Sequence, residues 1–354
     1  MSKVSYLLGA GASYGTRTKP TDETFSSLPN YISRGLPILQ EFPYALEQLT
    51  AELEGVVENK IAIKYINSSI LNPLLNVSRD YPTVDTYAKM LYATEQDDAY
   101  RKFKDQLSLF FLTWQKDHKH DLRYDSFIAS LVDAETCQFP PLTILSWNYD
   151  MQFEMSFLDY VTVGKALWRI WDRLNVYCKS NEKLKYRADN PFAFIKLNGS
   201  AMYHTDKIDS DSSRYPLQEA LWTKASQEDF WEEAIDTYNN SRPENIMHNP
   251  KYKNELSYAW ENAGKEKLLH VINQRVVDCE VLVVIGYSFP YVNREIDRHI
   301  FNNMPNIKKI YIQDKQAKNI EERIKAIYEY LKKTLPNIET TEDVSYFFLP
   351  NELG

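Results

Sequence analysis

Residues Val4–Gly15 read VSYLLGAGASYG, an apolar run followed by a short stretch that contains three glycines. The run Val4–Leu8 is rich in apolar residues on both faces, which is typical of a strand in a parallel sheet covered by helices. Glycines at a strand-to-helix turn let backbone N–H groups approach a diphosphate, and the helix N-terminus adds positive potential. The stretch therefore predicts a nucleotide-phosphate turn. The alternative is a tight turn that binds no ligand.

The scarcity of glycine favours the first interpretation. The chain has only 10 glycines among 354 residues, roughly 3% against a usual value of about 7%. Three of them, Gly9, Gly11 and Gly15, fall within seven residues, with the spacing G-x-G-x-x-x-G. This spacing is neither the G-x-G-x-x-G of ordinary dehydrogenases nor a P-loop, which needs a lysine that is missing here.

Composition excludes several classes of protein. Apolar residues make up 44% and charged residues 25%, which is ordinary for a folded globular protein. The net charge of −8 gives no global basic excess for binding nucleic acid. The longest apolar runs are too short to span a bilayer. We therefore expect a cytoplasmic protein that binds neither nucleic acid nor membrane.

Cysteine and histidine offer no metal-site pattern. Cys137, Cys178 and Cys279 are far apart and form no Cys-x-x-Cys pair, which excludes a zinc ribbon and a disulfide framework. His118 and His120 stand two residues apart near a predicted helix end, so they do not share a helical face. We expect them to be exposed and to bind no metal.

Four further apolar runs predict strands: Leu142–Leu145, Phe192–Leu197, Val281–Ile285 and Ile310–Ile312. Apolar residues at three- and four-residue spacings predict helices over 98–116 and 316–332. Strands alternating with helices indicate a Rossmann-like, doubly wound α/β fold with a parallel sheet. We expect one domain over 1–354, with a largely helical insertion near 20–135 and a second excursion near 201–265.

Polar and small residues follow three of these strands, in SWNYD (146–150), KLNGS (196–200) and IGYSFP (285–290). In an open α/β sheet, ligands bind beyond the carboxyl ends of the strands. Asn148 and Asp150 therefore stand where reactive groups are expected. A turn role for Asn148 and helix capping for Asp150 are the structural alternatives.

In chain order, GAGAS (9–13), TVD (83–85), SWNYD, KLNGS and IGYSFP resemble the sirtuin-like family, specifically its zinc-free branch in prokaryotic antiphage defence. The resemblance implies NAD as substrate, no zinc, and hydrolysis of the nicotinamide–ribose bond. It also implies a homo-oligomer and a phage-sensing or ATPase partner protein. The catalytic residues expected are Asn148, Asp150 and Asn198. The NAD-binding residues expected are Gly9, Ala10, Gly11, Ala12, Ser13, Asp85, Asn148, Gly199, Gly286, Tyr287 and Ser288.

Two departures bear on the reaction. The chain lacks the four-cysteine zinc module of deacetylating sirtuins, which argues against a protein deacylase. The defence branch often carries K-L-H-G-S, and its histidine, the presumed acid or base, is Asn198 here. His204 is a possible substitute, although we expect it in a solvent-facing loop. Apart from the resemblance, Asp85 is predicted to cap a helix.

The sequence thus favours an NAD glycohydrolase, the NAD-depleting effector of an abortive-infection system. The alternative is a catalytically weak or inactive sensor or scaffold that binds NAD or ADP-ribose and acts through a partner protein.

Overall fold

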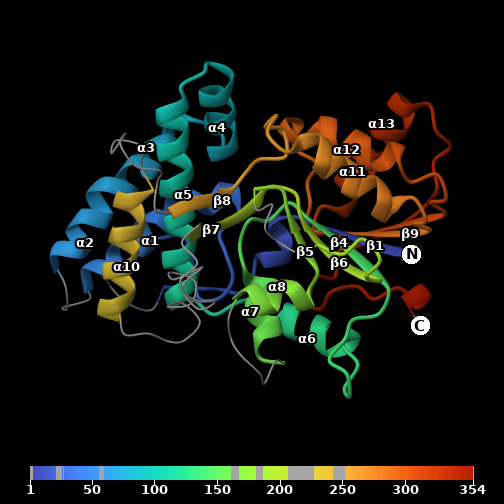
Figure 1. Cartoon of the computed structure of the whole chain (residues 1–354), viewed down its shortest axis with the longest axis horizontal. Helices are drawn as coiled ribbons and strands as arrows, with labels where there is room; N and C mark the ends of the chain where they lie inside the picture. Colours follow the sequence, from blue (N-terminus) through green and yellow to red (C-terminus); the bar gives the residue numbers. More distant parts are fainter. Residues whose placement is uncertain are drawn as a thin grey trace.

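A computed structural model of the chain describes residues 3–20, 26, 28–55, 60–160, 167–180, 186–205, 227–241 and 252–353. Its centre is a seven-stranded parallel sheet in the order β11-β10-β9-β1-β4-β6-β5 (Figure 1). The strands are β1 (Val4–Leu8), β4 (Leu142–Ser146), β5 (Val176–Cys178), β6 (Phe192–Lys196), β9 (Val281–Ile285), β10 (Lys309–Gln313) and β11 (Asn337–Thr341). The predicted Rossmann-like α/β fold is confirmed.

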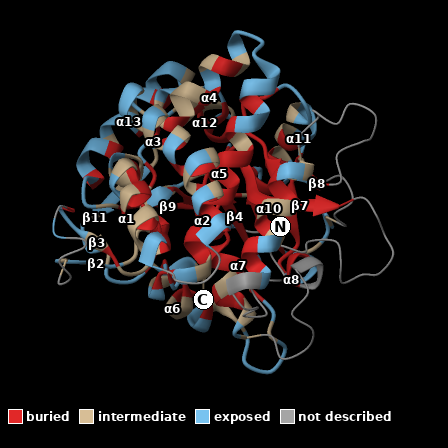
Figure 2. Cartoon of the chain, turned by 90° about the vertical axis from the view of Figure 1, so that its left-hand side faces the viewer, coloured by how far each residue is buried: buried red, intermediate tan, exposed pale blue. Residues whose placement is uncertain are grey.

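Both faces of the sheet are buried, as the uninterrupted apolar runs predicted. Every residue of β1, β4, β6 and β9 is buried. Successive side chains point to opposite faces, so Tyr6 and Leu8 belong to one core and Leu7 to the other. The second core is completed by α11 (Lys265–Val276), α12 (Arg294–Asn302) and α13 (Ala317–Leu331). Figure 2 shows buried residues along the strands and exposed residues on the outward helix faces.

The other core is covered by helices that include the predicted insertion. The insertion contains α1 (Phe42–Gly55), α2 (Lys60–Ile66), α3 (Asn72–Asp80), α4 (Val84–Ala93), α5 (Asp97–Asp117) and α6 (Leu122–Leu131). α7 (Gln152–Leu158) and α8 (Leu167–Arg173) follow β4. The helix predicted over 98–116 is α5, with Phe103, Leu107 and Trp114 buried. Among the described helices, none combines the length and the apolar character that crossing a membrane requires.

The second excursion is only partly within the described residues. Its described part pairs β7 (Gly199–Thr205) with β8 (Tyr252–Leu256) in antiparallel fashion and adds α10 (Gln227–Asn240). It contacts the insertion through Asp105 on α5: the Asp105 carbonyl accepts from Tyr203 Oη at 3.0 Å, and its carboxylate accepts from Asn254 Nδ2 at 2.9 Å. The insertion and the second excursion therefore pack against each other at one end of the sheet.

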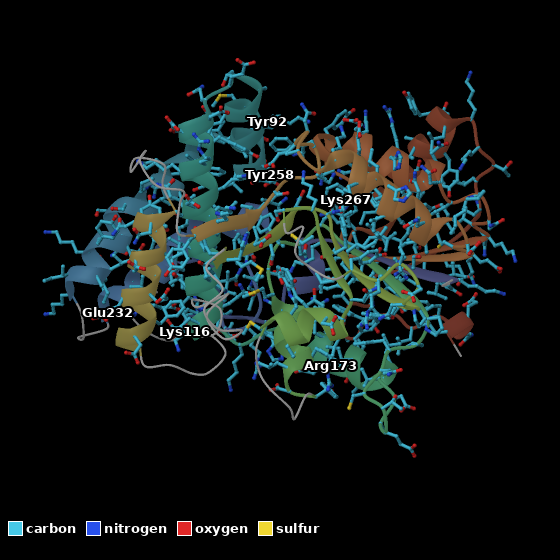
Figure 3. All side chains as sticks on the ribbon, in the orientation of Figure 1. Tyr92, Lys116, Arg173, Glu232, Tyr258 and Lys267 are labelled. Atoms are coloured by element: carbon cyan, nitrogen blue, oxygen red, sulfur yellow. The ribbon has the colours of Figure 1, made fainter. Side chains whose placement is uncertain are left out.

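An aromatic cluster strengthens this contact. Tyr92 and Tyr100 of the insertion lie 5.3 and 6.3 Å, ring to ring, from Trp260, which stacks on Tyr258 at 4.8 Å. Tyr92 and Tyr258 lie close together where the insertion meets the segment after β8 (Figure 3). The cluster joins the last turn of α4 and the start of α5 to the segment after β8.

Two predictions about histidine are wrong. His204 is buried in β7, and its Nδ1 lies 2.5 Å from Glu255 Oε1 on the neighbouring β8. His118 is also buried, because its ring stacks on Trp114 at 3.9 Å. His118 is enclosed by other residues of the insertion, including Gln48 and Trp114, and His204 by the pairing of β7 with β8, which neither local sequence indicates.

Candidate functional site

The carboxyl ends of the central strands meet at one edge of the sheet. Leu8, the last residue of β1, is in register with Ser146 of β4 and Ile285 of β9, and Ser146 is in register with Lys196 of β6. The chain builds outward from β1 through β4 and β6, then places β9, β10 and β11 on the other side of β1. The β1–β9 boundary is thus the topological switch point, where folds of this class bind ligands.

At this boundary the glycine turn packs on the loop after β9. Gly9 N donates to Ile285 O at 3.0 Å, and Gly11 N donates to Gly286 O at 2.9 Å. A Cβ atom added to Gly11 would lie 2.7 Å from Gly286 Cα, closer than real Cβ contacts. Gly286 itself has a φ of +59°, which favours glycine. The close approach of two backbones therefore accounts for these glycines without a ligand.

The α-helix expected directly after the glycine turn is not formed. Ala10–Ser13 form a single 3-10 turn, and the short strand β2 (Arg17–Thr18) follows. Gly15 separates them with a φ of +67°, and its Cα packs on the Arg34 carbonyl. Ala10 is exposed, and its N–H donates to no backbone oxygen of the described residues. One amide of the turn therefore stays accessible to a ligand.

Asn148 fastens the glycine turn to β4. Its Nδ2 donates to Gly9 O at 2.9 Å and to Ser13 Oγ at 3.1 Å. Ser13 Oγ donates to Asp150 Oδ2 at 2.9 Å and lies 3.0 Å from Tyr124 Oη. Within the described chain, Asn148 Oδ1 accepts no hydrogen bond. That oxygen is the part of Asn148 left for a ligand.

Asp150 is engaged at both carboxylate oxygens. Besides the bond from Ser13, its Oδ1 accepts from Gln152 N at 2.9 Å, at the start of α7. The N-cap of α7 is Met151, so Asp150 does not cap the helix as predicted but lies one residue before the cap. Burial raises the pKa of its carboxyl. Beneath it, Lys196 Nζ donates to Asp150 O at 2.5 Å and to Glu154 Oε1 at 2.7 Å, with both side chains fully buried.

Asn198 is held by backbone groups on two sides. Its Nδ2 donates to Trp147 O at 3.3 Å, and its Oδ1 accepts from Ala259 N at 3.0 Å. Gly199 has a φ of +70°, and an added Cβ would collide with Glu255 O of the neighbouring strand. Gly199 thus lies in the β7–β8 pairing, whereas Asn198 borders the cavity described next.

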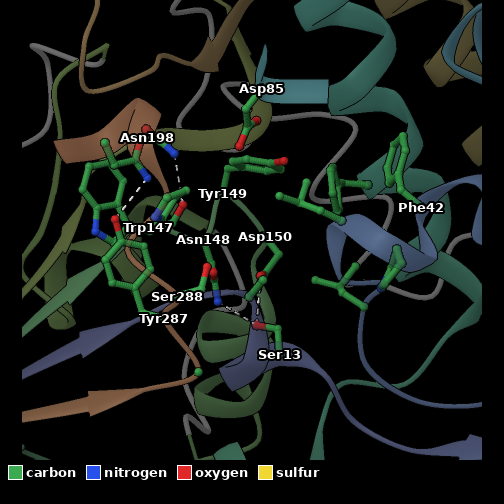
Figure 4. A pocket seen from close by; sticks show the side chains of 18 residues that line it. Ser13, Phe42, Asp85, Trp147, Asn148, Tyr149, Asp150, Asn198, Tyr287 and Ser288 are labelled. Atoms are coloured by element: carbon green, nitrogen blue, oxygen red, sulfur yellow. Dashed lines mark hydrogen bonds between the residues drawn. The ribbon is translucent and has the colours of Figure 1, made fainter. Parts of the chain in front are cut away.

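A cavity of about 120 Å³ lies over these strand ends (Figure 4). One wall comes from the sheet and carries most of the predicted site residues: Ala10, Ser13, Asn148, Asp150, Asn198, Gly286, Tyr287 and Ser288. The opposite wall comes from the insertion and includes Leu39, Phe42, Asp85 and Phe111. Motifs from both ends of the sequence, with Ala10 in one and Ser288 in another, therefore border one small cavity.

Aromatic rings give part of this cavity a flat wall. Trp147 and Tyr287 stack with centroids 5.5 Å apart and planes 15° apart. Tyr287 Oη donates to the buried carboxylate of Asp297, 3.0 Å from each oxygen, and burial raises the pKa of Asp297 well above its usual range. Because its hydroxyl is committed, Tyr287 offers the cavity chiefly its ring, a surface suited to stacking.

Asp85 is the unusual group of the insertion wall. The N-cap of α4 is Thr83, whose side chain accepts from Thr86 N at 3.1 Å, so the prediction that Asp85 caps the helix is wrong. Asp85 Oδ1 is buried and has no hydrogen-bond partner among the described residues. Burial raises the pKa of this carboxyl to about 6. Figure 4 shows Asp85 above the Tyr149 ring.

A second cavity of about 330 Å³ adjoins the first and shares Ala10, Leu39, Gly286 and Ser288 with it. Gly11, Tyr14, Arg123 and Lys315 are among its other lining residues. Arg123 Nη2 donates to Gly11 O at 2.8 Å and pairs with Asp121 at 2.5 Å. The two cavities flank the glycine contact, one aromatic and small, the other larger and bordered by two cations.

Some predicted residues lie behind these surfaces, and some important residues were not predicted. Gly9, Ala12 and Gly199 are absent from the described lining of both cavities. Sequence reasoning missed Arg123, which no motif marks. It also missed the pair of Lys196 and Glu154, although a lysine closing the apolar run Phe192–Leu197 was a usable signal.

The described residues contain no group of three or more His, Cys, Asp or Glu side chains placed to hold a metal ion. No protein-family model matches the sequence, and no curated protein matches it.

Proposed function

We propose that the chain binds NAD across the two adjoining cavities and hydrolyses its nicotinamide–ribose bond. The observation that carries the proposal is the convergence of five separated motifs on one switch point, where Asn148 Oδ1 and Asp85 Oδ1 accept no hydrogen bond from the described residues. The smaller cavity, with its flat aromatic wall, suits the nicotinamide ring. The larger one, bordered by Arg123 and Lys315, suits the diphosphate and adenosine.

In this proposal Asn148 positions the ribose. Its Nδ2 is occupied by the glycine turn, so its Oδ1 accepts a hydrogen bond from a ribose hydroxyl. The bond from C1′ to the pyridinium nitrogen breaks, the electron pair stays on that nitrogen, and neutral nicotinamide leaves. The ribose passes through an oxocarbenium-like transition state. Holding the ribose in one place lowers the barrier before any proton moves.

In this proposal Asp85 is the general base, a role for which the amide of Asn198 is unsuited. A carboxylate near the cation stabilises it, and Asp85 Oδ1 is buried without a hydrogen-bond partner among the described residues, although Tyr258 interacts with the same carboxylate. Water attacks C1′, and its proton passes to Asp85, whose pKa of about 6 suits a base at neutral pH. Asp150 and Asn198, engaged by the protein itself, act as positioning residues rather than as the reacting groups predicted from the sequence.

The test is to incubate purified protein with NAD and to separate the products by chromatography. Nicotinamide and ADP-ribose should appear in equal amounts without an acylated peptide. Asn148→Ala should abolish turnover, and Asp85→Asn should slow it by about 10²–10⁴, the usual contribution of a general base. Turnover that is unchanged in both variants would refute the site. Turnover that needs an acyl-lysine substrate would indicate a deacylase.

A second candidate is a sensor that binds NAD or ADP-ribose and acts on a partner protein. It is favoured by the absence of a histidine from the described lining of either cavity and by the structural engagement of Asn198. Calorimetry with ADP-ribose and chromatography after incubation with NAD together distinguish the two candidates. A sensor binds ADP-ribose but releases no nicotinamide from NAD. In either case the resemblance suggests NAD-linked antiphage defence, with self-assembly or a partner protein as the trigger.

A further inference from the structure

A separate cavity of about 460 Å³ lies on the other side of the loop 286–290, between α12 and α13. Three arginines border it: Arg294 and Arg298, one turn apart on α12, and Arg323 on α13. Phe289 and Ile327 give it apolar surface. None of its lining residues except Pro290 borders the first cavity, so it is a distinct site.

The positive charge of this cavity is not balanced by ion pairs. In the part of the chain that the structure describes, no carboxylate forms a salt bridge with any of the three arginines. The two acidic residues of the lining are committed elsewhere: Asp297 accepts from Tyr287 Oη, and Glu322 lies 2.8 Å from Lys325 Nζ. Burial also raises the pKa of Asp297, which disfavours its charged form. Three arginines that form no salt bridge with a described carboxylate thus converge in a chain whose net charge is −8, and the one electrostatic partner among them is the raised-pKa Asp297 beside Arg294.

The arginine side chains are held in place but keep unused donors. Arg294 Cζ lies 3.7 Å over the Tyr291 ring, and Arg298 Cζ lies 3.3 Å over the Tyr330 ring. Arg298 Nε is buried and has no hydrogen-bond partner among the described residues. A buried donor without a partner is unfavourable. An anion with several acceptor oxygens would satisfy these donors together.

We propose that this arginine cavity binds a small phosphorylated molecule, with Arg294, Arg298 and Arg323 around its phosphates. The planar fork of arginine matches phosphate oxygens in bidentate fashion. Three arginines match the multiple charge of a diphosphate better than the single charge of a carboxylate. The apolar surface of Phe289 and Ile327 accommodates the organic part of such a ligand.

The arginine cavity adjoins a loop that also borders the first two cavities. Arg323 Nη1 donates to Ser288 O, and Ser288 borders the first two cavities. The next residue, Phe289, has a φ of +52°, an uncommon conformation for a bulky side chain. A phosphate that draws Arg323 toward itself would therefore act on a loop shared with the candidate NAD site. Only this link, and not the binding itself, rests on the proposed function.

The test titrates the full chain with inorganic pyrophosphate and with ADP by calorimetry. Both titrations should contain a saturable component that Arg294→Gln and Arg298→Gln each weaken at least tenfold. Arg298→Lys should weaken it less than Arg298→Gln, because the charge remains and only the fork is lost. Lys318→Gln, an exposed charge removal on α13, should leave this component within twofold. Lys315→Gln identifies any separate component in the second cavity, to which the proposed function also assigns phosphates.

Circular dichroism checks that each variant is folded. Because Arg294→Gln and Arg298→Gln are separate variants, one of them still tests the proposal if the other fails to fold. The proposal is overturned if neither probe binds, if the arginine variants bind as tightly as the wild type, or if adenosine binds as tightly as ADP. It is also overturned if Lys315→Gln alone removes binding, since the phosphates would then lie in the second cavity. These readouts use no NAD, so they remain valid if the proposed NAD hydrolysis fails.

Discussion

Asp85→Asn should stabilise the protein by an amount that grows with pH. The Asp85 carboxyl has a pKa of about 6 in the folded chain instead of 3.8, because burial penalises its charged form. At about 1.36 kcal/mol per pKa unit, keeping this carboxylate ionised costs the folded state about 3 kcal/mol at pH 8. At pH 5 the cost is about 1.6 kcal/mol, because the folded carboxyl is then mostly protonated.

The sign follows from proton binding. Between pH 3.8 and pH 6 the folded chain holds a proton at Asp85 that the unfolded chain has released, so this group lowers stability as the pH rises. Asparagine does not titrate. The stability gained by Asp85→Asn should therefore increase by about 1.4 kcal/mol between pH 5 and pH 8. Any constant cost of burying the new amide cancels from this difference.

Urea unfolding followed by circular dichroism at pH 5, 6, 7 and 8 measures the effect. Asp189→Asn, at an exposed aspartate before β6, is the control and should show no such pH trend. The activity of the wild type should rise with pH through about 6, as the base form of Asp85 accumulates, and the residual activity of the variant should lack this step. A gain in stability that is equal at pH 5 and pH 8 would refute the reasoning about Asp85.

Two further predictions concern stability. Lys196→Met and Glu154→Leu should each lower the free energy of unfolding by about 3–5 kcal/mol in urea melts, because each leaves a fully buried partner uncompensated. The double variant Lys196→Met/Glu154→Leu should lose much less than the sum of the two, and simple additivity would contradict the pairing. Gly11→Ala should cost about 1–3 kcal/mol, because its Cβ would lie 2.7 Å from Gly286 Cα, whereas Gly55→Ala, with open space around the added atom, should change stability by no more than about 1 kcal/mol in the same melts.

The sequence predicted the longer buried strands of the sheet and missed the short buried strand β5 and the exposed edge strand β11. β1, β4, β6, β9 and β10 follow their apolar runs closely. β11 was missed because its residues Asn337–Thr341 are polar and largely exposed, at the edge of the sheet beside β10 alone. β7 and β8 pair with each other outside the sheet, so no local signal fixes their partner.

The candidate site was likewise predicted only in part. Strand ends are readable from sequence, and so Asn148, Asn198, Tyr287 and Ser288 were named before the structure placed them around one cavity. The state of their side chains is not readable. Only the structure reveals that Asp150 is saturated by Ser13 and Gln152 N, or that an insertion helix brings Asp85 over the strand ends. The bond from Ser13 and the position of Asp85 depend on contacts between residues that are far apart in the sequence.

The contact between Gly11 and Gly286 has an evolutionary consequence. In most tightly packed pairs, enlargement of one partner can be offset by a smaller residue at the other. Here both partners are already glycine, and each Cα occupies the space of the other's missing Cβ. No compensating pair of substitutions exists, so this rim of the site offers no route by which related chains could reshape it. Changes in ligand preference would have to arise across the gap, where the insertion presents Leu39, Phe42 and Phe111, side chains that can still be made smaller.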